Sequence, residues 1–251
     1  MRNIVTMLLL MTVSLIPTLA QDLPTTITTN DQWTPIERDF DGVLMVLVPA
    51  GCFSTTVDDT PYDICFETPF WLDKTEVTQA DFARLGGEKA QPNSFEGELL
   101  PVETITWHEA QAFCELRGGR LPLELEWEYA ARGVDGLLYP WGDEWDETLL
   151  QWNWADSERT AEVGSFPAGM SWVGALDMAG NVYEWTDSAF IPYPNQIRSA
   201  ELADHLSFIL RGGSWFETSA NGFLTTSRDF HHPTESNNTY GLRCARDYQA
   251  E

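Results

Sequence analysis

Four side chains near the end of the sequence are of the types that bind transition metals. His231 and His232 are adjacent, and Glu217 and Asp229 supply carboxylates nearby in the chain. Imidazole and carboxylate groups are ordinary zinc ligands. Their spacing matches no standard ligand pattern, and adjacent side chains on a strand point in opposite directions. The alternative interpretation is a polar loop in which both histidines are solvated beside Pro233.

A second group of oxygen-bearing residues favours calcium. Between residues 177 and 184, oxygens are available from the Asp177 carboxylate, the Gly180 and Val182 carbonyls and the Glu184 carboxylate. Calcium takes about six to eight oxygens and accepts backbone carbonyls from a tight loop. The alternative is a glycine turn whose acids bond to nearby amides.

Nucleophilic catalysis and phosphate binding have weaker signals. Ser214 follows two glycines but lacks the glycine two positions later that a nucleophile elbow requires. The sequence also has no glycine-rich phosphate-binding loop. We therefore expect neither activity.

The secondary structure that must position these residues contains few regular elements. Residues 43–48 form a continuous apolar run and residues 70–73 a shorter one, and both predict buried strands. Thr78 is a candidate N-cap for a helix that ends near Leu85, and Thr106 with Glu109 predicts a capping box at the start of a second helix.

A third helix is expected to follow Pro122 and to end at Gly133. Leu123 occupies its cap position and has no side-chain acceptor, so we expect the charge of Glu124 alone to favour the positive helix end. Short strands are predicted at residues 209–212 and 241–246. Residues 186–208 are expected to form a long surface loop.

The composition limits the possible partners. The chain of 251 residues has 39 acidic and 14 basic residues, for a net charge of −25. Nucleic acids and anionic membranes require clustered Lys and Arg, so we expect neither as a partner. Such an acidic surface attracts divalent cations or a basic client. The 43% hydrophobic content is enough for a core.

The N-terminal residues predict export. Arg2 precedes a mostly apolar run and Ala20 precedes a candidate cleavage point, so residues 1–20 are typical of a signal peptide. The apolar run is too short for a comfortable membrane span, and the next residue is Gln21 rather than a lipid-bearing Cys. We therefore expect a secreted or periplasmic protein without a stable membrane anchor. Residues 21–41 are polar and aperiodic and predict a flexible leader.

The chain has four cysteines, for which three pairings are open, and an exported protein is expected to pair them. They are Cys52, Cys65, Cys114 and Cys244.

Five ordered blocks of sequence resemble the formylglycine-generating enzyme family, whose domains are also called sulfatase-modifying factor domains. The blocks are Gly119-Arg120-Leu121-Pro122 continuing to Glu126-Trp127-Glu128-Tyr129-Ala130-Ala131-Arg132-Gly133, then Tyr139-Pro140-Trp141-Gly142-Asp143-Glu144, Asp177-Met178-Ala179-Gly180-Asn181-Val182-Tyr183-Glu184-Trp185-Thr186, Arg211-Gly212-Gly213-Ser214-Trp215 and Gly241-Leu242-Arg243-Cys244. The resemblance implies an α+β fold over residues 42–248. That fold is a single loop-rich mixed domain, distantly C-type-lectin-like, with few helices and short antiparallel strands.

The resemblance also implies roles for individual residues. It implies disulfides Cys52–Cys65 and Cys114–Cys244. It assigns a structural calcium to residues at the positions of Asp177, Gly180, Val182 and Glu184. Five arginines fall in family-like positions, and each is expected to have a buried carboxylate partner such as Glu126 or Glu128. They are Arg120, Arg132, Arg211, Arg228 and Arg243.

The oxidising members of the family hold copper with two cysteines that follow the Gly-Gly-Ser-aromatic block. At the matching positions this sequence has Glu217 and Gly222. Neither residue is a useful Cu(I) ligand, because Cu(I) prefers thiolates. The sequence therefore predicts the fold of the family without bound copper and without the copper-dependent oxidation.

Three functions are compatible with these patterns. The first is an exported module that binds a peptide or small molecule on one face, whose residues are Trp215, Glu217, Arg228, His231 and His232. The second is an oxidoreductase or maturation enzyme of the family that uses a non-cysteine site, which requires these side chains to converge on one pocket. The third is a lectin-like receptor with variable positions near Asn221, Asn237 and Asn238.

Overall fold

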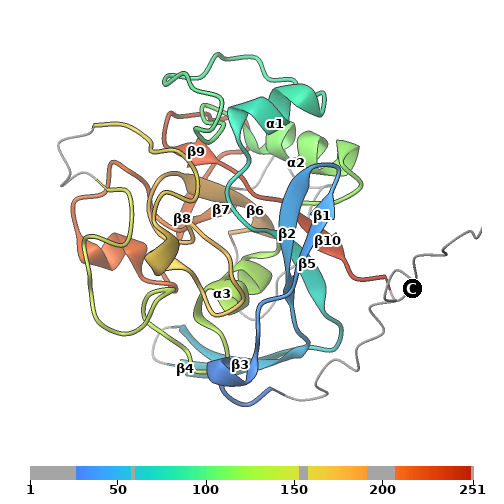
Figure 1. The fold of residues 1–251 in the computed structure, drawn as a ribbon. Helices are drawn as coiled ribbons and strands as arrows, with labels where there is room; N and C mark the ends of the chain where they lie inside the picture. The colour runs from blue at the N-terminus through green and yellow to red at the C-terminus, as the bar shows by residue number, and fades with distance from the viewer. Residues whose placement is uncertain (1–26, 58–59, 153–157, 191–206, 250–251) are drawn as a thin grey trace, which may run out of the picture.

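The computed structural model describes residues 27–57, 60–152, 158–190 and 207–249. The predicted signal peptide lies outside these residues. Figure 1 shows the strands, which are β1 (Glu37–Phe40), β2 (Val43–Val48), β3 (Gly51–Val57), β4 (Thr60–Phe66), β5 (Phe70–Asp73), β6 (Tyr183–Ala189), β7 (Phe208–Arg211), β8 (Asp229–His231), β9 (Tyr240–Gly241) and β10 (Ala245–Asp247). The α-helices are α1 (Gln79–Arg84), α2 (Trp107–Leu116) and α3 (Glu124–Arg132), and short 3-10 turns lie at Asn30–Gln32, Pro167–Gly169 and Ala220–Phe223.

The described strands form two four-stranded sheets and one hairpin. The first sheet has the order β1-β2-β5-β10, and the second has the order β8-β7-β6-β9. The strands β3 and β4 pair with each other at the bottom of the view in Figure 1, below α3, whereas α1 and α2 lie at the top. The pairs are antiparallel except for β6 and β9, which run parallel and set Tyr183 beside Tyr240. This mixed α+β architecture is the predicted one, with one parallel pair in addition.

The apolar runs form the predicted strands. Four of the six residues of β2 are buried, and all four residues of β5 are buried. In the centre of the first sheet, β2 pairs with β5 so that Leu47 lies opposite Trp71. Continuous apolar sequence is expected where both faces of a strand are covered.

Two of the helices begin with the predicted caps. In α1 the Thr78 hydroxyl accepts a 3.0 Å hydrogen bond from the Asp81 amide. In α2 the Thr106 hydroxyl accepts from the Glu109 amide at 3.3 Å, and the Glu109 carboxylate accepts from the Thr106 amide at 2.9 Å.

The start of α3 differs from the prediction. Leu123 supplies no side-chain cap, as expected. The acceptor for the Glu124 amide is instead the hydroxyl of Ser188, at 3.0 Å, which β6 brings to the helix end. Glu124 itself is fully buried, and its carboxylate binds the Arg228 guanidinium. The helix end is therefore satisfied by a hydroxyl from another element, in addition to the charge of Glu124.

Residues 27–41 are not the flexible leader that the sequence predicts. Ile27 and Trp33 are buried in the same apolar cluster as β2 and α3, and Glu37–Phe40 is strand β1, paired with β2. The ordered structure therefore begins before residue 42, because apolar side chains in this polar stretch fill the edge of the core. Residues 186–189, expected in a surface loop, belong to β6, and residues 191–206 lie outside the described residues.

Both implied disulfides are present. Cys52 and Cys65 are directly opposite each other on β3 and β4 and are exposed. Cys114 of α2 bonds Cys244, and both are buried in the cluster that packs α2 against β6, β7 and β9. The second bond ties residues 130 positions apart and joins α2 to the segment before β10.

The arginines in family-like positions have the predicted carboxylate partners. Arg120 binds Glu126 at 2.6 Å, Arg132 and Arg211 bind Glu128 at 3.0 and 2.7 Å, and Arg243 binds Glu184 at 2.6 Å. Arg228 binds Glu124. Buried guanidinium groups require such partners because an unpaired buried charge is very costly. Among the described residues, no helix is both long enough and apolar enough to span a membrane.

Candidate functional site

The two positions that carry copper-binding cysteines in oxidising relatives lie next to each other. A Cβ added to Gly222 would lie 2.8 Å from Glu217 Oε2, and its three nearest neighbours are all atoms of Glu217. Both positions follow β7, on the turn and the short 3-10 helix that lead from Ser214 to Phe223. The two positions are thus close together, but one carries a carboxylate and the other has no side chain.

Glu217 is bound by a tyrosine of β6. The Tyr183 hydroxyl donates a 2.6 Å hydrogen bond to Glu217 Oε1. Burial raises the pKa of Tyr183 strongly, and the hydrogen bond to Glu217 and the nearby carboxylate charges add to the shift. Tyr183 therefore stays protonated and acts as a donor at physiological pH.

A strip of aromatic and acidic side chains continues from this pair. Tyr240 lies beside Tyr183 in the β6–β9 pairing, and its ring lies 4.8 Å from the ring of His231. His231 Nδ1 lies 3.0 Å from Glu235, and Nε2 lies 3.5 Å from Asp229. Burial raises the pKa of Tyr240, and the charges of Asp229 and Glu235 add to this shift. We call these residues, with Glu217 and Tyr183, the acidic–aromatic strip.

The remaining residues of the predicted ligand face are arranged differently. Trp215 is buried, and its indole Nε1 donates to the Asn238 carbonyl at 3.1 Å. Arg228 turns toward Glu124, and its guanidinium lies 5.6 Å from the Phe190 ring centroid. His232 Nδ1 lies 2.8 Å from the Thr234 hydroxyl. The structure thus brings Glu217 and His231 into one strip, whereas Arg228 and His232 make separate local contacts.

The transition-metal site considered for His231, His232, Glu217 and Asp229 does not form. Glu217 is bonded to Tyr183, and the two histidines bond different partners. Across the described ranges, no group of three or more His, Cys, Asp or Glu side chains is placed to hold a metal ion. The spacing matched no standard ligand pattern, and the two adjacent histidines do not turn to one centre here.

The predicted calcium loop is a tight, buried turn. Asp177 and Asn181 have positive φ values of 56° and 58°, which non-glycine residues adopt rarely. Gly180 has φ 82°, and a Cβ there would lie 2.3 Å from the Gln151 carbonyl oxygen. Asp177 Oδ2 accepts from the Gly164 amide at 2.6 Å. The loop is therefore a close-packed turn with no room for a side chain at position 180.

The charge around this loop is not balanced. Glu76, Asp177 and Glu184 are buried close enough for their charges to repel, and Arg243 is the guanidinium among them. Burial raises the pKa of Asp177 to about 6, against the Gly164 hydrogen bond and the Arg243 charge. Burial likewise raises the pKa of Glu76, and Asp177 and Glu184 add to it.

These residues fit a calcium ion in charge and in type of ligand, with one restriction. A hard cation would neutralise the excess of buried carboxylates, and Gly180 and Val182 could add carbonyl oxygens. Glu184 Oε2 already accepts from Arg243 at 2.6 Å and from Trp127 at 2.7 Å, and Oε1 accepts from Arg243 at 2.7 Å. Glu184 could therefore contribute only through the remaining lone pair of Oε1.

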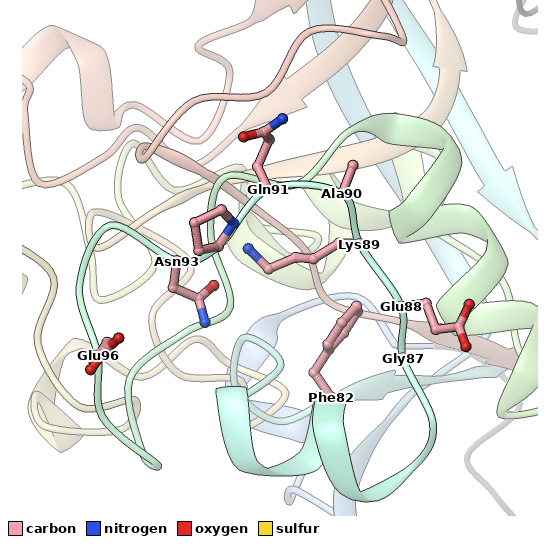
Figure 2. A pocket seen from close by; sticks show the side chains of 9 residues that line it. Phe82, Gly87, Glu88, Lys89, Ala90, Gln91, Asn93 and Glu96 are labelled. Carbon is pink, nitrogen blue, oxygen red and sulfur yellow. The ribbon is translucent and has the colours of Figure 1, made fainter.

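A large surface hollow lies beside helix α1. It has a volume of about 780 Å³ and is lined by Phe82 and by residues of the segment 87–96 (Figure 2). Figure 2 shows Lys89 extending across it, while Glu88 points away. Lys89 Nζ donates to the Glu103 carbonyl at 2.7 Å, and burial lowers the Lys89 pKa. The same segment reaches the ligand face through Phe95, whose ring packs edge-on against Trp215 at 5.4 Å.

Sequence reasoning missed Tyr183, Tyr240 and Glu76. A weak signal existed for Tyr183, because the alternation of a strand places it on the face opposite Val182 and Glu184. Tyr240 enters through a parallel pairing between distant segments, and Glu76 through hydrogen bonds to Asn181 and the Val182 amide. Neither contact has a local sequence signal.

Comparisons with known proteins agree with this geometry. The family model described as "Sulfatase-modifying factor enzyme 1-like domain" matches residues 33–248. The chain is 35% identical over 161 residues to the mouse protein named inactive C-alpha-formylglycine-generating enzyme 2, which covers 58% of this chain and 49% of the relative. It is also 35% identical over 163 residues to the hercynine oxygenase of Mycolicibacterium thermoresistibile, which covers 59% of this chain and 36% of that protein. The chain therefore spans about half or less of the length of these two relatives.

A solved structure has the same fold. PvdO from Pseudomonas aeruginosa superposes with a TM-score of 0.70 over 86% of this chain and 98% of its own, at 23% sequence identity. At this identity the similarity concerns the fold alone.

Proposed function

Because this chain belongs to the sulfatase-modifying factor enzyme 1-like domain family, we propose that it is an exported, ligand-binding member that does not generate formylglycine. The observation that carries the proposal is the contact between Glu217 and Gly222, which occupy the positions of the copper-binding cysteines. All four cysteines of the chain are in disulfides, so none supplies a thiolate. Cu(I) chemistry needs thiolate ligands of the kind that this pair of residues lacks.

The acidic–aromatic strip supports a ligand that carries a positive charge. Carboxylates of Glu217, Asp229 and Glu235 lie along the rings of Tyr183 and Tyr240. A cation is attracted both by carboxylates and by the faces of aromatic rings. The net charge of −25 also favours the approach of a cation. We therefore infer that the ligand is a basic peptide or a small organic cation.

A family member that acts as an enzyme through a non-cysteine site is the second candidate. The similarity to a protein named hercynine oxygenase favours it. Such an enzyme would need the predicted side chains to meet in one pocket. Arg228 and His232 turn away from Glu217, and this favours binding over catalysis.

The proposal has two further parts, which concern the location of the protein and a bound calcium ion. The disulfides support a protein that works outside the cytoplasm, where such bonds persist. We also propose that a structural calcium ion is held by Asp177, the Gly180 and Val182 carbonyls and Glu184. Its chemistry there would be charge neutralisation of a buried turn.

The first experiment tests oxidation. The purified protein is incubated with copper and a peptide that carries a sulfatase-type cysteine motif, and an active relative serves as the control. We expect mass spectrometry to find no aldehyde in the peptide with this protein. Conversion of the cysteine to an aldehyde would overturn the proposal.

The second experiment tests the ligand class. Fluorescence anisotropy compares a labelled Lys- and Arg-rich peptide with its Asp- and Glu-substituted counterpart. We expect saturable binding of the basic peptide, weakened by E217Q and by D229N and unchanged by D146N at an exposed position. Equal binding to all three variants would exclude the acidic–aromatic strip as the site.

A further inference from the structure

Two hollows meet at the exposed disulfide of the β3–β4 hairpin. The first has a volume of about 550 Å³ and is lined by both Cys52 and Cys65. The second has a volume of about 380 Å³ and is lined by Cys65 but not by Cys52. We call the second one the Cys65 hollow. In Figure 1 the hairpin lies at the bottom of the view, away from β8 and β9 of the acidic–aromatic strip.

Strand alternation turns this disulfide toward solvent. On β3 the side chains of Phe53 and Thr55 are buried, so Cys52 lies on the opposite face of the hairpin. Cys65 is the direct partner of Cys52 on β4, and both residues are exposed. The bond is therefore accessible to small molecules in the folded protein.

The hairpin has other attachments to the rest of the domain. The rings of Phe53 and Phe66 each lie 5.3 Å from the ring of Tyr129 in α3. The Thr55 hydroxyl donates a 2.6 Å hydrogen bond to the buried carboxylate of Glu128. Because these contacts do not involve the sulfur atoms, they remain when the disulfide opens. We therefore expect the disulfide to exchange in the folded protein rather than only after unfolding.

The position of the Cys65 hollow distinguishes the two sulfur atoms. A thiolate attacks one sulfur of a disulfide in line with the bond, from the side opposite the sulfur that leaves. Because Cys52 and Cys65 face each other across the hairpin, the in-line approach to Cys65 lies on the side of β4 away from β3. The Cys65 hollow is bounded by residues that follow β4 and β10, so it opens on that side. Cys65 is thus the sulfur open to attack, and Cys52 is the leaving thiolate.

The charge around the Cys65 hollow favours some thiols over others. Its lining contains three carboxylates and one guanidinium, which belong to Glu67, Glu126, Asp247 and Arg120. Arg120 lies 2.6 Å from Glu126 and 2.8 Å from Asp247, so its charge is already compensated. Exposed Glu67 lines both hollows. An entering molecule therefore meets net negative charge, which favours a cationic thiol over an anionic one.

We propose that Cys52–Cys65 is a thiol-exchange site whose substrate is a small aminothiol. The thiolate of the substrate attacks the Cys65 sulfur, a bond forms between these two sulfur atoms, and the Cys65–Cys52 bond breaks. The electron pair of the broken bond goes to the Cys52 sulfur, which leaves as a thiolate and takes a proton from water. The product carries the aminothiol as a mixed disulfide on Cys65 and a free thiol on Cys52.

The size of the hollow agrees with a small substrate. Ligand pockets usually have volumes of roughly 300–1,000 Å³, and the Cys65 hollow, at about 380 Å³, lies at the lower end of this range. The exchange site is separate from the proposed cation-binding strip and does not depend on it.

The alternative is a disulfide that only cross-links the hairpin. An exposed cross-link is also reduced by thiols, so reduction alone does not separate the two explanations. They differ in which sulfur carries the adduct and in whether the charge of the thiol matters. A cross-link without a preferred approach gives adducts on both cysteines and similar rates for thiols of either charge.

The first test incubates the folded protein with cysteamine and traps free thiols with N-ethylmaleimide. Peptide mapping by mass spectrometry then locates the two labels. We expect cysteamine on Cys65 and maleimide on Cys52 in most of the exchanged protein. Neither label should appear on Cys114 or Cys244, whose burial makes them reporters of the folded state. Cysteamine mainly on Cys52, or no adduct in the folded protein, would overturn the proposal.

The second test compares cysteamine with mercaptoacetate. Each rate is expressed per thiolate and divided by the rate of the same thiol with hydroxyethyl disulfide, which removes differences in intrinsic nucleophilicity. We expect cysteamine to react several-fold faster at low salt, and the difference to shrink at high salt. E67Q should reduce this preference, whereas the matched control D146N, at an exposed position outside both hollows, should keep it. Equal rates for the two thiols, or an E67Q variant that behaves as D146N does, would exclude the Cys65 hollow as the route of entry.

Discussion

The hydroxyl of Tyr183 donates a 2.6 Å hydrogen bond to Glu217, and the same carboxylate occupies the space beside Gly222. Glu217 is therefore bonded to a protonated tyrosine, and its side chain fills the space that a side chain at position 222 would need. In oxidising relatives, cysteines stand at the positions of Glu217 and Gly222. This chain keeps the proximity of the two positions while it replaces sulfur by a bonded carboxylate.

Restoring two cysteines should create a Cu(I) site. Gly222 has no positive φ, and the nearest atoms to an added Cβ belong to Glu217, so E217C also removes the obstacle to G222C. Two adjacent thiolates are good Cu(I) ligands. We expect the double variant E217C/G222C, with its new thiols free and the two native disulfides intact, to bind one Cu(I) in competition with a chromophoric chelator, and the unmodified protein with intact disulfides to bind none.

The single variants are the controls for this prediction. E217C and G222C each supply one new thiol, so each should compete much more weakly than the double variant. A folded double variant that binds no Cu(I) would mean that the two positions do not approach as closely as the structure indicates.

Removal of the Tyr183 hydroxyl should destabilise the protein, whereas removal of the Tyr129 hydroxyl should not. The hydroxyl of Tyr183 bonds Glu217, whereas that of Tyr129 is buried and has no hydrogen-bond partner within the described residues. We expect Y183F to lower the free energy of unfolding by roughly 1–2 kcal/mol, and Y129F to leave it unchanged or raise it. Urea unfolding of the two variants measures both. A larger loss in Y129F than in Y183F would contradict the assignment of these contacts.

Local signals explain which parts of the fold could be predicted. The apolar runs of β2 and β5 and the caps Thr78 and Thr106 each act within a few residues, so the sequence alone locates these elements. The predicted disulfides and the predicted carboxylate partners of the five arginines depended on the family resemblance, because it relates distant blocks of sequence.

The parts that could not be predicted depend on distant contacts. The cap of α3 comes from Ser188, 64 residues away in sequence. Trp33 and β1 lie in a stretch that reads as polar, and their order comes from packing on β2 and α3. For the candidate site, Glu217 and Gly222 followed from counting along the motif, but the Tyr183–Tyr240 neighbourhood required the parallel β6–β9 pairing.

The two disulfides should differ in stability and in access. In the chain-entropy model, the loop closed by Cys52–Cys65 is worth about 3 kcal/mol and the loop closed by Cys114–Cys244 about 5 kcal/mol. Cys52 and Cys65 are exposed, and Cys114 and Cys244 are buried. We expect dithiothreitol to reduce the first bond in the native protein and the second only as the protein unfolds.

Timed alkylation and mass spectrometry follow the two reductions. The paired substitutions C52A/C65A and C114A/C244A measure how much each disulfide contributes to the free energy of unfolding. We expect C114A/C244A to cause the larger loss. Earlier reduction of Cys114–Cys244 in the native protein would contradict its burial.

Removal of calcium should destabilise the chain. A cation that binds only the folded state adds about 2.7 kcal/mol when its concentration is a hundred times its Kd. We expect EDTA to lower the melting temperature and added calcium, but not magnesium, to restore it, because the carbonyl-rich loop suits the larger ion. D177N keeps an oxygen for the Gly164 amide yet loses the charge, so it should abolish the response to calcium. The control D146N should respond as the unmodified protein does, and a calcium response that persists in D177N would exclude Asp177 as a ligand.

The hydroxyl of Ser188 should stabilise the protein by as much as a local N-cap on α3 would. It accepts from the Glu124 amide, one of the helix donors that have no partner within the helix, and Leu123 at the cap position cannot do so. We expect S188A to lower the free energy of unfolding by about 1 kcal/mol, the usual value of a lost cap. S54A is the matched control, because the Ser54 hydroxyl donates to the exposed Asp63 carboxylate, and the substitution should change stability by less than about 0.5 kcal/mol. The substitution L123T offers a new acceptor to the Glu126 amide, whereas Ser188 accepts from the Glu124 amide. In chemical unfolding, the effects of L123T and S188A should therefore add rather than compensate each other. A loss in S188A no greater than that in S54A would show that the charge of Glu124 is sufficient at this helix end.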